Sequence, residues 1–133
     1  MNEGFLKCRG HVLGIDVKTG KTVFENHNMF VQLGLNELAK IVGGQKGTVP
    51  SHIAVGTSKV APNKGDTALK GSELGRKAFD SVKVTDSTIS FMASFGAGVA
   101  TGVWEETGMF TANSGGIMWS RALTGTYTKK DKD

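Results

Sequence analysis

Residues 89–95 read Ile-Ser-Phe-Met-Ala-Ser-Phe, and this stretch decides the fold. Its larger apolar side chains recur at every second position, which is the period of a β-strand with one buried face. We expect Phe91 and Phe95 to enter the core from this strand. Glycines at 96, 98 and 102 end the pattern. The sequence therefore predicts a β-strand here, closed by a glycine-rich turn.

Strand patterns also lie on both sides of this stretch. A turn at 85–87 connects it to the preceding strand, and Phe79 has the opposite parity there, so we expect a bulge near Asp80 and Ser81. A polar loop covers residues 57–67, and a turn at 111–116 joins the last two strands. Strands are expected at residues 11–17, 21–25, 29–31, 53–55, 82–84, 103–110 and 117–123.

One segment has the period of a helix instead. Leu35, Leu38, Ile41 and Val42 are spaced three and four apart, and Gly43-Gly44 supplies a stop. The fold class predicted is mainly β, an antiparallel, jelly-roll-like sandwich with one short α-helix near residues 33–42. We expect a single domain over residues 1–128 and a flexible, charged tail over 129–133.

Composition excludes several classes of protein. The chain has 133 residues with 19 glycines and two prolines and shows no Gly-X-Y period, so it is not collagen-like. Many β-branched residues between the glycines argue against disorder. The net charge of +4 forms no basic stripe, so we expect no nucleic-acid partner. One cysteine excludes an internal disulfide, and the absence of a long apolar run predicts no membrane segment.

Two motifs that suggest ligand binding have simpler explanations. Gly20-Lys21-Thr22 resembles the end of a phosphate-binding loop, but Ile15 stands where that loop needs a glycine, so a hairpin turn is favoured. Cys8 and His11 form one close pair, whereas a zinc site brings two, so His27 and His52 are not expected to complete one. We expect no metal and no cofactor.

Acidic and aromatic residues give two further candidates. Glu105 and Glu106 are adjacent, so in a strand they point to opposite faces and cannot act together on one bond. Trp104 and Trp119 flank the turn at 111–116 and are candidates to pair across it, as core or subunit contacts. The alternative is an exposed platform for a sugar or a protein.

A series of short motifs covers most of the chain from residue 28 onward. In order, they are Asn28-Met29-Phe30-Val31, Gly34-Leu35, Leu38-Ala39, Gly43-Gly44, Ile53-Ala54-Val55-Gly56-Thr57, Asp66-Thr67-Ala68-Leu69, Glu73-Leu74, Arg76, Ile89-Ser90-Phe91 with Ala93 and Phe95, Glu106-Thr107-Gly108-Met109-Phe110, Gly115-Gly116-Ile117-Met118 and Arg121. This order resembles a small β-rich module of tailed-bacteriophage virion proteins, found in tail-fibre, tail-collar and related components.

The resemblance implies a structural role without catalysis. It implies a virion protein, made in the host cytoplasm, that assembles with itself (a trimer is one expected form) and with other virion proteins of the tail fibre, collar or baseplate. Among the residues at its recurring positions, Glu73, Arg76, Glu106 and Arg121 are expected to form ion pairs that fix strand register or a subunit seam. Gly108 is expected at a turn or a close backbone approach.

Three alternatives stay open. The same module is suited to capsid decoration. A carbohydrate- or receptor-binding sandwich using Trp104 or Trp119 belongs to a different class of function, as does a polysaccharide-cleaving enzyme with two facing carboxylates.

Overall fold

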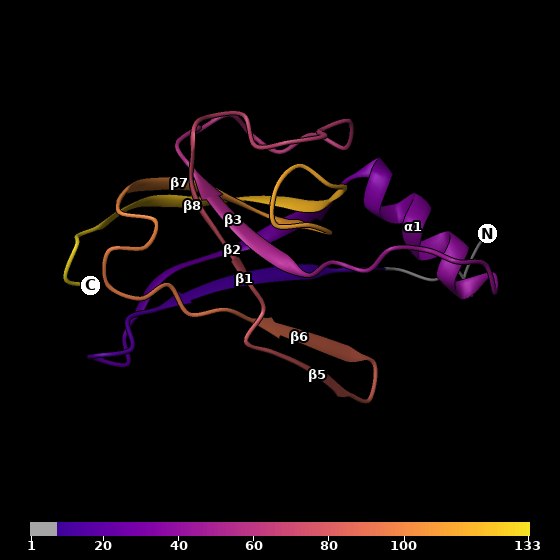
Figure 1. Ribbon diagram of the computed structural model, residues 1–133, viewed down its shortest axis with the longest axis horizontal. Coiled ribbons are helices and arrows are strands. Elements are labelled where there is room, and N and C mark those ends of the chain that lie inside the picture. The colour runs from indigo at the N-terminus through magenta and orange to yellow at the C-terminus, as the bar shows by residue number, and fades with distance from the viewer. Residues whose placement is uncertain (1–7) are drawn as a thin grey trace.

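A computed structural model describes residues 8–133 of the chain (Figure 1). Its elements in chain order are β1 (Gly10–Ile15), β2 (Thr22–Phe30), α1 (Gln32–Val42), β3 (His52–Gly56), β4 (Glu73–Ala78), β5 (Ser81–Thr85), β6 (Thr88–Met92), β7 (Gly102–Phe110) and β8 (Met118–Lys129).

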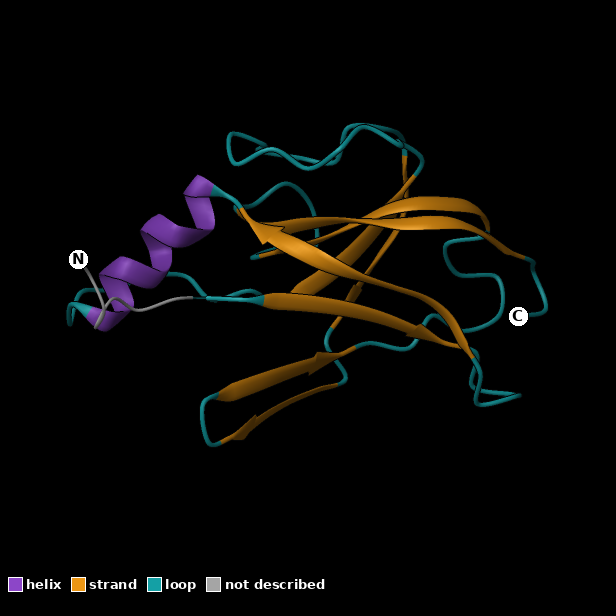
Figure 2. Ribbon diagram, turned by 180° about the vertical axis from the view of Figure 1, so that it is seen from behind, coloured by secondary structure: helices purple, strands orange, loops and turns teal. Residues whose placement is uncertain are grey.

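The fold is mainly β, with two antiparallel sheets in a sandwich-like arrangement and one short helix (Figure 2). Six strands form the larger sheet in the order β1-β2-β8-β7-β3-β4, and β5 pairs only with β6. The larger sheet is open, because β1 and β4 are its two edges. The predicted mainly β, antiparallel fold with one short helix near 33–42 is confirmed.

The first hairpin and the helix form where the sequence predicts them. β1 and β2 pair from Gly10 opposite Asn28 to Ile15 opposite Thr22, and Gly20 takes a positive φ of 72° in the connecting turn. α1 begins directly after β2 and lies against β8. A Cβ atom on Gly34 would approach the backbone of Trp119 to 2.6 Å, so glycine permits this close packing of helix on strand.

The core has two parts, one on each face of the larger sheet. Ala54 and Val55 are consecutive on β3, so their side chains point to opposite faces. On one face Ala54 packs with Val31, Phe110 and Met118, and Leu69 of the following loop covers them. On the other face Val55 packs with an aromatic cluster that contains Phe24, Phe95, Trp104 and Tyr127.

The region around the deciding stretch differs from the sequence prediction. Residues 73–78 form a strand that the pattern did not reveal, and the expected bulge at Asp80 is a break between β4 in the larger sheet and β5 in the hairpin. β6 ends at Met92, so Phe95 reaches the core from a loop, with its ring centroid 5.2 Å from that of Trp104. Phe91 stays on the hairpin and belongs to neither part of the core. Its ring centroid lies 4.9 Å from that of Phe79.

The C-terminal residues are tied to two loops. β8 continues to Lys129, whose ammonium donates to the carbonyl of Gly96 at 2.8 Å, so the boundary expected after residue 128 falls inside a strand. The carbonyl of Asp131 accepts from the amide of Gly98 at 2.7 Å, and that of Lys132 accepts from Lys18 at 2.8 Å.

Candidate functional site

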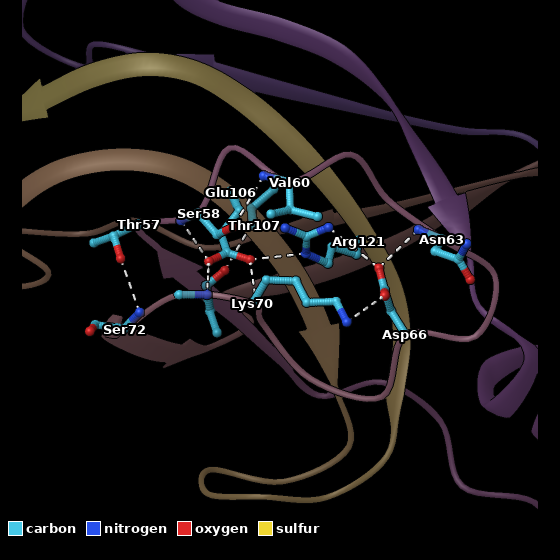
Figure 3. A network of polar contacts seen from close by, with 12 residues as sticks. Thr57, Ser58, Val60, Asn63, Asp66, Lys70, Ser72, Glu106, Thr107 and Arg121 are labelled. Carbon is cyan, nitrogen blue, oxygen red and sulfur yellow. Dashed lines mark hydrogen bonds and ion pairs between the residues drawn. The ribbon is translucent and has the colours of Figure 1, made fainter.

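An arginine–glutamate pair lies completely buried between β7 and β8. Arg121 Nε donates to Glu106 Oε1 at 2.9 Å (Figure 3), and both side chains are 0% exposed. They share one face of the sheet, because Arg121 lies opposite Gly108, two residues along β7 from Glu106. Burying two charges is costly, so further hydrogen bonds have to satisfy them.

The loop of residues 57–72 provides these bonds to Glu106. Backbone amides of Ser58 and Lys70 donate to its carboxylate at 2.9 Å, and that of Gly71 donates at 2.8 Å. The two ends of the loop therefore meet at one carboxylate (Figure 3). This meeting is close enough that a Cβ atom on Gly71 would lie 2.6 Å from the amide nitrogen of Ser58.

Asp66, in the middle of the same loop, supplies a second carboxylate. Its Oδ2 lies 3.3 Å from Arg121 Nη1 and accepts from the amide of Asn63 at 2.9 Å, and its Oδ1 lies 3.3 Å from Lys70 Nζ. Asp66 is 3% exposed. We call the buried Asp66, Glu106 and Arg121, together with Lys70, whose side chain is 46% exposed, the buried ion network.

Both carboxylates of the buried ion network are stabilised in the charged form. Burial raises the pKa of Glu106, but hydrogen bonds from the three loop amides and from Arg121 outweigh it, so the pKa lies below its ordinary value. Burial likewise raises the pKa of Asp66, and the Asn63 amide together with Lys70 and Arg121 lowers it below the ordinary value. Neither group is suited to be a proton donor near neutral pH.

The buried ion network therefore has the chemistry of a structural anchor. Glu106 accepts four hydrogen bonds and has no exposed surface for a substrate. One desolvation cost remains at Arg121, because its Nη2 is buried without a hydrogen-bond partner among the described residues. The network holds the 57–72 loop on one face of β7 and β8.

The other predicted charged pair also forms. Arg76 donates from Nε and Nη2 to both carboxylate oxygens of Glu73, at 3.0 and 2.8 Å. Its Nη1 donates to the carbonyls of Ala112 at 2.9 Å and Gly115 at 2.8 Å, and the guanidinium lies 3.9 Å from the ring centroid of Phe110. Arg76 thus clamps the turn between β7 and β8 onto β4. Both ion pairs lie within one chain.

Gly108 lies at a close approach, as expected for this position. It is opposite Ala54 on β3 and Arg121 on β8. A Cβ atom on Gly108 would come within 3.1 Å of the carbonyl oxygen of Ser120 and of the Met118 side chain. The small residue lets the core pack against the centre of the sheet.

Glu105 and Glu106 do not follow simple strand alternation. A register shift between Trp104 and Glu106 leaves Glu105 without a partner residue on β8. Glu105 accepts from Thr126 Oγ1 at 3.0 Å and lies 3.9 Å from Lys59, next to the Ser58 that binds Glu106. Glu105 therefore lies outside the regular β7–β8 register, and Glu105 and Glu106 both contact the stretch of loop at Ser58 and Lys59.

Both tryptophans are core residues, and the structure does not pair them. Trp104 lies opposite Tyr127, whereas Trp119 lies near the other end of the β7–β8 ladder, so the expected pairing across the turn is wrong. Trp104 is 7% exposed and donates to the Ala100 carbonyl at 2.7 Å, and Trp119 is 6% exposed and donates to the Thr48 carbonyl at 2.9 Å. Neither forms an exposed ligand platform.

The histidines and the glycine-lysine motif also have structural positions. His11 and His27 face each other on β1 and β2, whereas His52 lies on β3 and contacts Ser51. Gly20 and Lys21 belong to the turn before β2. Within residues 8–133, no three His, Cys, Asp or Glu side chains are placed to hold a metal ion.

Sequence reasoning identified Glu106 and Arg121 but missed Asp66 and Lys70 as members of one network. Their spacing of four within a polar loop was the available signal, but a loop pattern does not say what the loop covers.

The described part of the chain contains no helix with the length and apolar character needed to cross a bilayer. No family model, curated protein or solved structure matches the chain.

Proposed function

We propose that the chain is a structural subunit of a tailed-bacteriophage virion, without enzymatic activity, which assembles with copies of itself and with other virion proteins. Its place in the particle is the tail fibre, collar or baseplate, or an adaptor between them. Capsid decoration by the same module is the alternative. The virion assignment depends on the motif order from residue 28 onward, described above.

The β5–β6 hairpin carries the assembly part of the proposal. Val82, Val84 and Ile89 are each more than half exposed on it, although their pattern is that of a buried face. Isolated two-stranded hairpins are marginally stable in water, and exposed apolar faces commonly mark protein contacts. A subunit that is completed by its neighbours accounts for this arrangement.

The polar groups also fit a structural subunit better than an enzyme. Glu106 and Asp66 are occupied by loop amides and cations, and Glu73 is occupied by Arg76. The two tryptophans that a sugar platform would use are buried. These contacts stabilise a scaffold and leave its edges and loops available for neighbours.

Quantitative mass spectrometry of purified virions tests the assignment. We expect the chain in the particle at a fixed ratio to the major capsid protein. A small multiple of three or six copies favours the tail, collar or baseplate, and hundreds favour capsid decoration. Absence from purified particles, despite production in the infected cell, would contradict the proposal.

A further inference from the structure

The β5–β6 hairpin, which we call the hairpin arm, has one entirely apolar face. Val82 lies opposite Phe91 and Val84 opposite Ile89, so these four side chains share a face. Val84 is 67% exposed, and Val82 and Ile89 are 54% exposed. The other face carries Lys83 opposite Ser90. The hairpin arm thus has the two-sided pattern of a sheet that packs on something, yet it stands away from the larger sheet (Figures 1 and 2).

The base of the hairpin arm is firmly held. Asp80 accepts from the amide of Ser94 at 2.6 Å and from Lys77 Nζ at 2.8 Å, and its own amide donates to the Met92 carbonyl at 2.7 Å. Phe79 packs against Phe91 next to these contacts of Asp80. The hairpin arm is therefore fixed at its base while Val82, Val84 and Ile89 on its apolar face stay more than half exposed.

A second apolar feature is concave. An open groove of about 960 Å³ lies between α1, the end of β2 and the loop at 62–64. Leu35, Leu38 and Val42 of α1 line one wall, and Met29 and Pro62 line the other. Val42 is 67% exposed and Met29 is 41% exposed, so residues 8–133 leave part of this apolar lining uncovered.

The sizes of the two features favour contact between the hairpin arm and the groove. The face of five residue pairs on two strands measures roughly 17 by 10 Å, or about 170 Å². Stacking two such faces about a two-fold axis falls far short of the roughly 800 Å² per partner of a stable interface. A protruding arm seated in a groove buries its edges as well as its face, together with both groove walls.

Charge complements shape at the end of the hairpin arm. Asp86 lies at the tip, in the turn between β5 and β6, with a φ of 53°. Lys64 lines the groove, and no carboxylate of the described residues forms an ion pair with it. Seating the arm tip at the loop of residues 62–64 would bring these opposite charges together.

We propose that the hairpin arm of one copy of the chain docks in the groove of a second copy, with Asp86 near Lys64. This inference rests on the proposed function, because it names the surface through which the subunit assembles with itself. Arm and groove are different surfaces, so the contact is head-to-tail and builds a closed ring when the rotation closes.

Paired substitutions on the two faces of the hairpin arm test the contact. Val84→Thr with Ile89→Thr removes apolar groups while keeping β-branched side chains, and Lys83→Thr with Ser90→Thr is the matched change on the other face. Light scattering after size-exclusion chromatography is expected to show the first variant as a monomer and the second as an oligomer like the unchanged chain.

Cross-linking identifies what receives the hairpin arm. Cys8 lines the groove and is the only cysteine, so Ser87→Cys at the arm tip creates a single new thiol. A short bis-maleimide is expected to link Ser87→Cys chains into dimers and larger species through Cys8, and adding Cys8→Ser should remove the links. Ser114→Cys, in the turn between β7 and β8, is the control that should not cross-link.

The possible outcomes separate this inference from the proposed function. If the unchanged chain is oligomeric and Val84→Thr with Ile89→Thr leaves it so, the hairpin arm is not the contact, while self-assembly stands. Cross-links that persist in the Ser87→Cys, Cys8→Ser variant would show tip-to-tip pairing and overturn the groove as the receptor. A chain that stays monomeric at every concentration overturns both this inference and the self-assembly of the proposed function.

Discussion

The β7–β8 pair and the β5–β6 hairpin are both antiparallel ladders. Proteins usually bury apolar side chains and expose charged ones, and each of these two ladders contains exceptions to that rule. β7 and β8 bury Glu106 and Arg121 completely, whereas β5 and β6 leave Val84 and Ile89 more than half exposed. The buried charges are tolerated because loop amides and a second carboxylate satisfy most of their hydrogen bonds. No part of residues 8–133 covers the exposed apolar face of the hairpin arm. This difference is consistent with a contact to a second molecule.

Removing the arginine from the buried ion network is expected to have the largest effect. Arg121→Met leaves the Glu106 charge buried without its cation, which costs about 3–5 kcal/mol in the free energy of unfolding. Urea unfolding followed by tryptophan fluorescence measures it. Lys77→Met, which removes an ion pair exposed to solvent, is the control and should cost less than about 1 kcal/mol. Equal losses for both variants would contradict the role assigned to Arg121.

Acid is expected to lower the free energy of unfolding through the two carboxylates of the buried ion network. The folded pKa values of Glu106 and Asp66 lie below their ordinary values, so their contribution is fully present above the ordinary values near pH 4. It is lost as the pH falls through the lowered pKa values, because protonation removes the charges that the loop amides, Lys70 and Arg121 stabilise. Urea midpoints between pH 7 and pH 2.5 measure this loss. Glu106→Gln should flatten the decline, and an unchanged slope would argue against Glu106 as its source.

Replacing the arginine that clamps the β7–β8 turn is expected to have a smaller effect. Arg76→Lys keeps the charge but loses the two-pronged contact with Glu73 and at least one bond to the Ala112 or Gly115 carbonyl. We expect a cost of about 1–2 kcal/mol in unfolding free energy, with faster amide hydrogen exchange in residues 111–116. Exchange that is unchanged in this turn would show that other contacts hold it.

Changing the hairpin arm is expected to affect the folded monomer least. Val84→Thr with Ile89→Thr removes no contact in the core, so unfolding free energy measured at low protein concentration should change by less than about 0.5 kcal/mol. This small change in unfolding free energy contrasts with the large loss expected for Arg121→Met. A loss of several kcal/mol would mean that the apolar face packs inside its own chain.

Much of the local structure could be predicted from the sequence. The β1–β2 hairpin, α1 and the β7–β8 pair follow from alternation, helical spacing and the glycines that end each element. The break between β4 and β5 could not be predicted, because a strand that changes sheets and a bulge leave the same shift of parity. Phe95 could not be placed on a loop, because its spacing continues that of β6.

The candidate site could be predicted only in part. The sequence indicated ion pairs among Glu73, Arg76, Glu106 and Arg121, and each acid meets one of the arginines. Asp66 and Lys70 join the network through a loop that crosses the sheet, a contact 55 residues apart in the chain for Asp66 and Arg121. No local pattern records such a contact. The buried position of Trp104 and Trp119 likewise depends on loops that come from other parts of the chain.

The sequence by itself determined the class of fold and the positions of most turns, because strand alternation and glycine act over a few neighbouring residues. Only the tertiary structure decided which patterned faces are buried. The most regular alternation in the chain begins on the hairpin arm, where Ile89 is more than half exposed, and the most deeply buried side chains include charged ones. The physical reason is that burial depends on what packs across a face, and that is fixed by residues distant in the chain or by a second molecule.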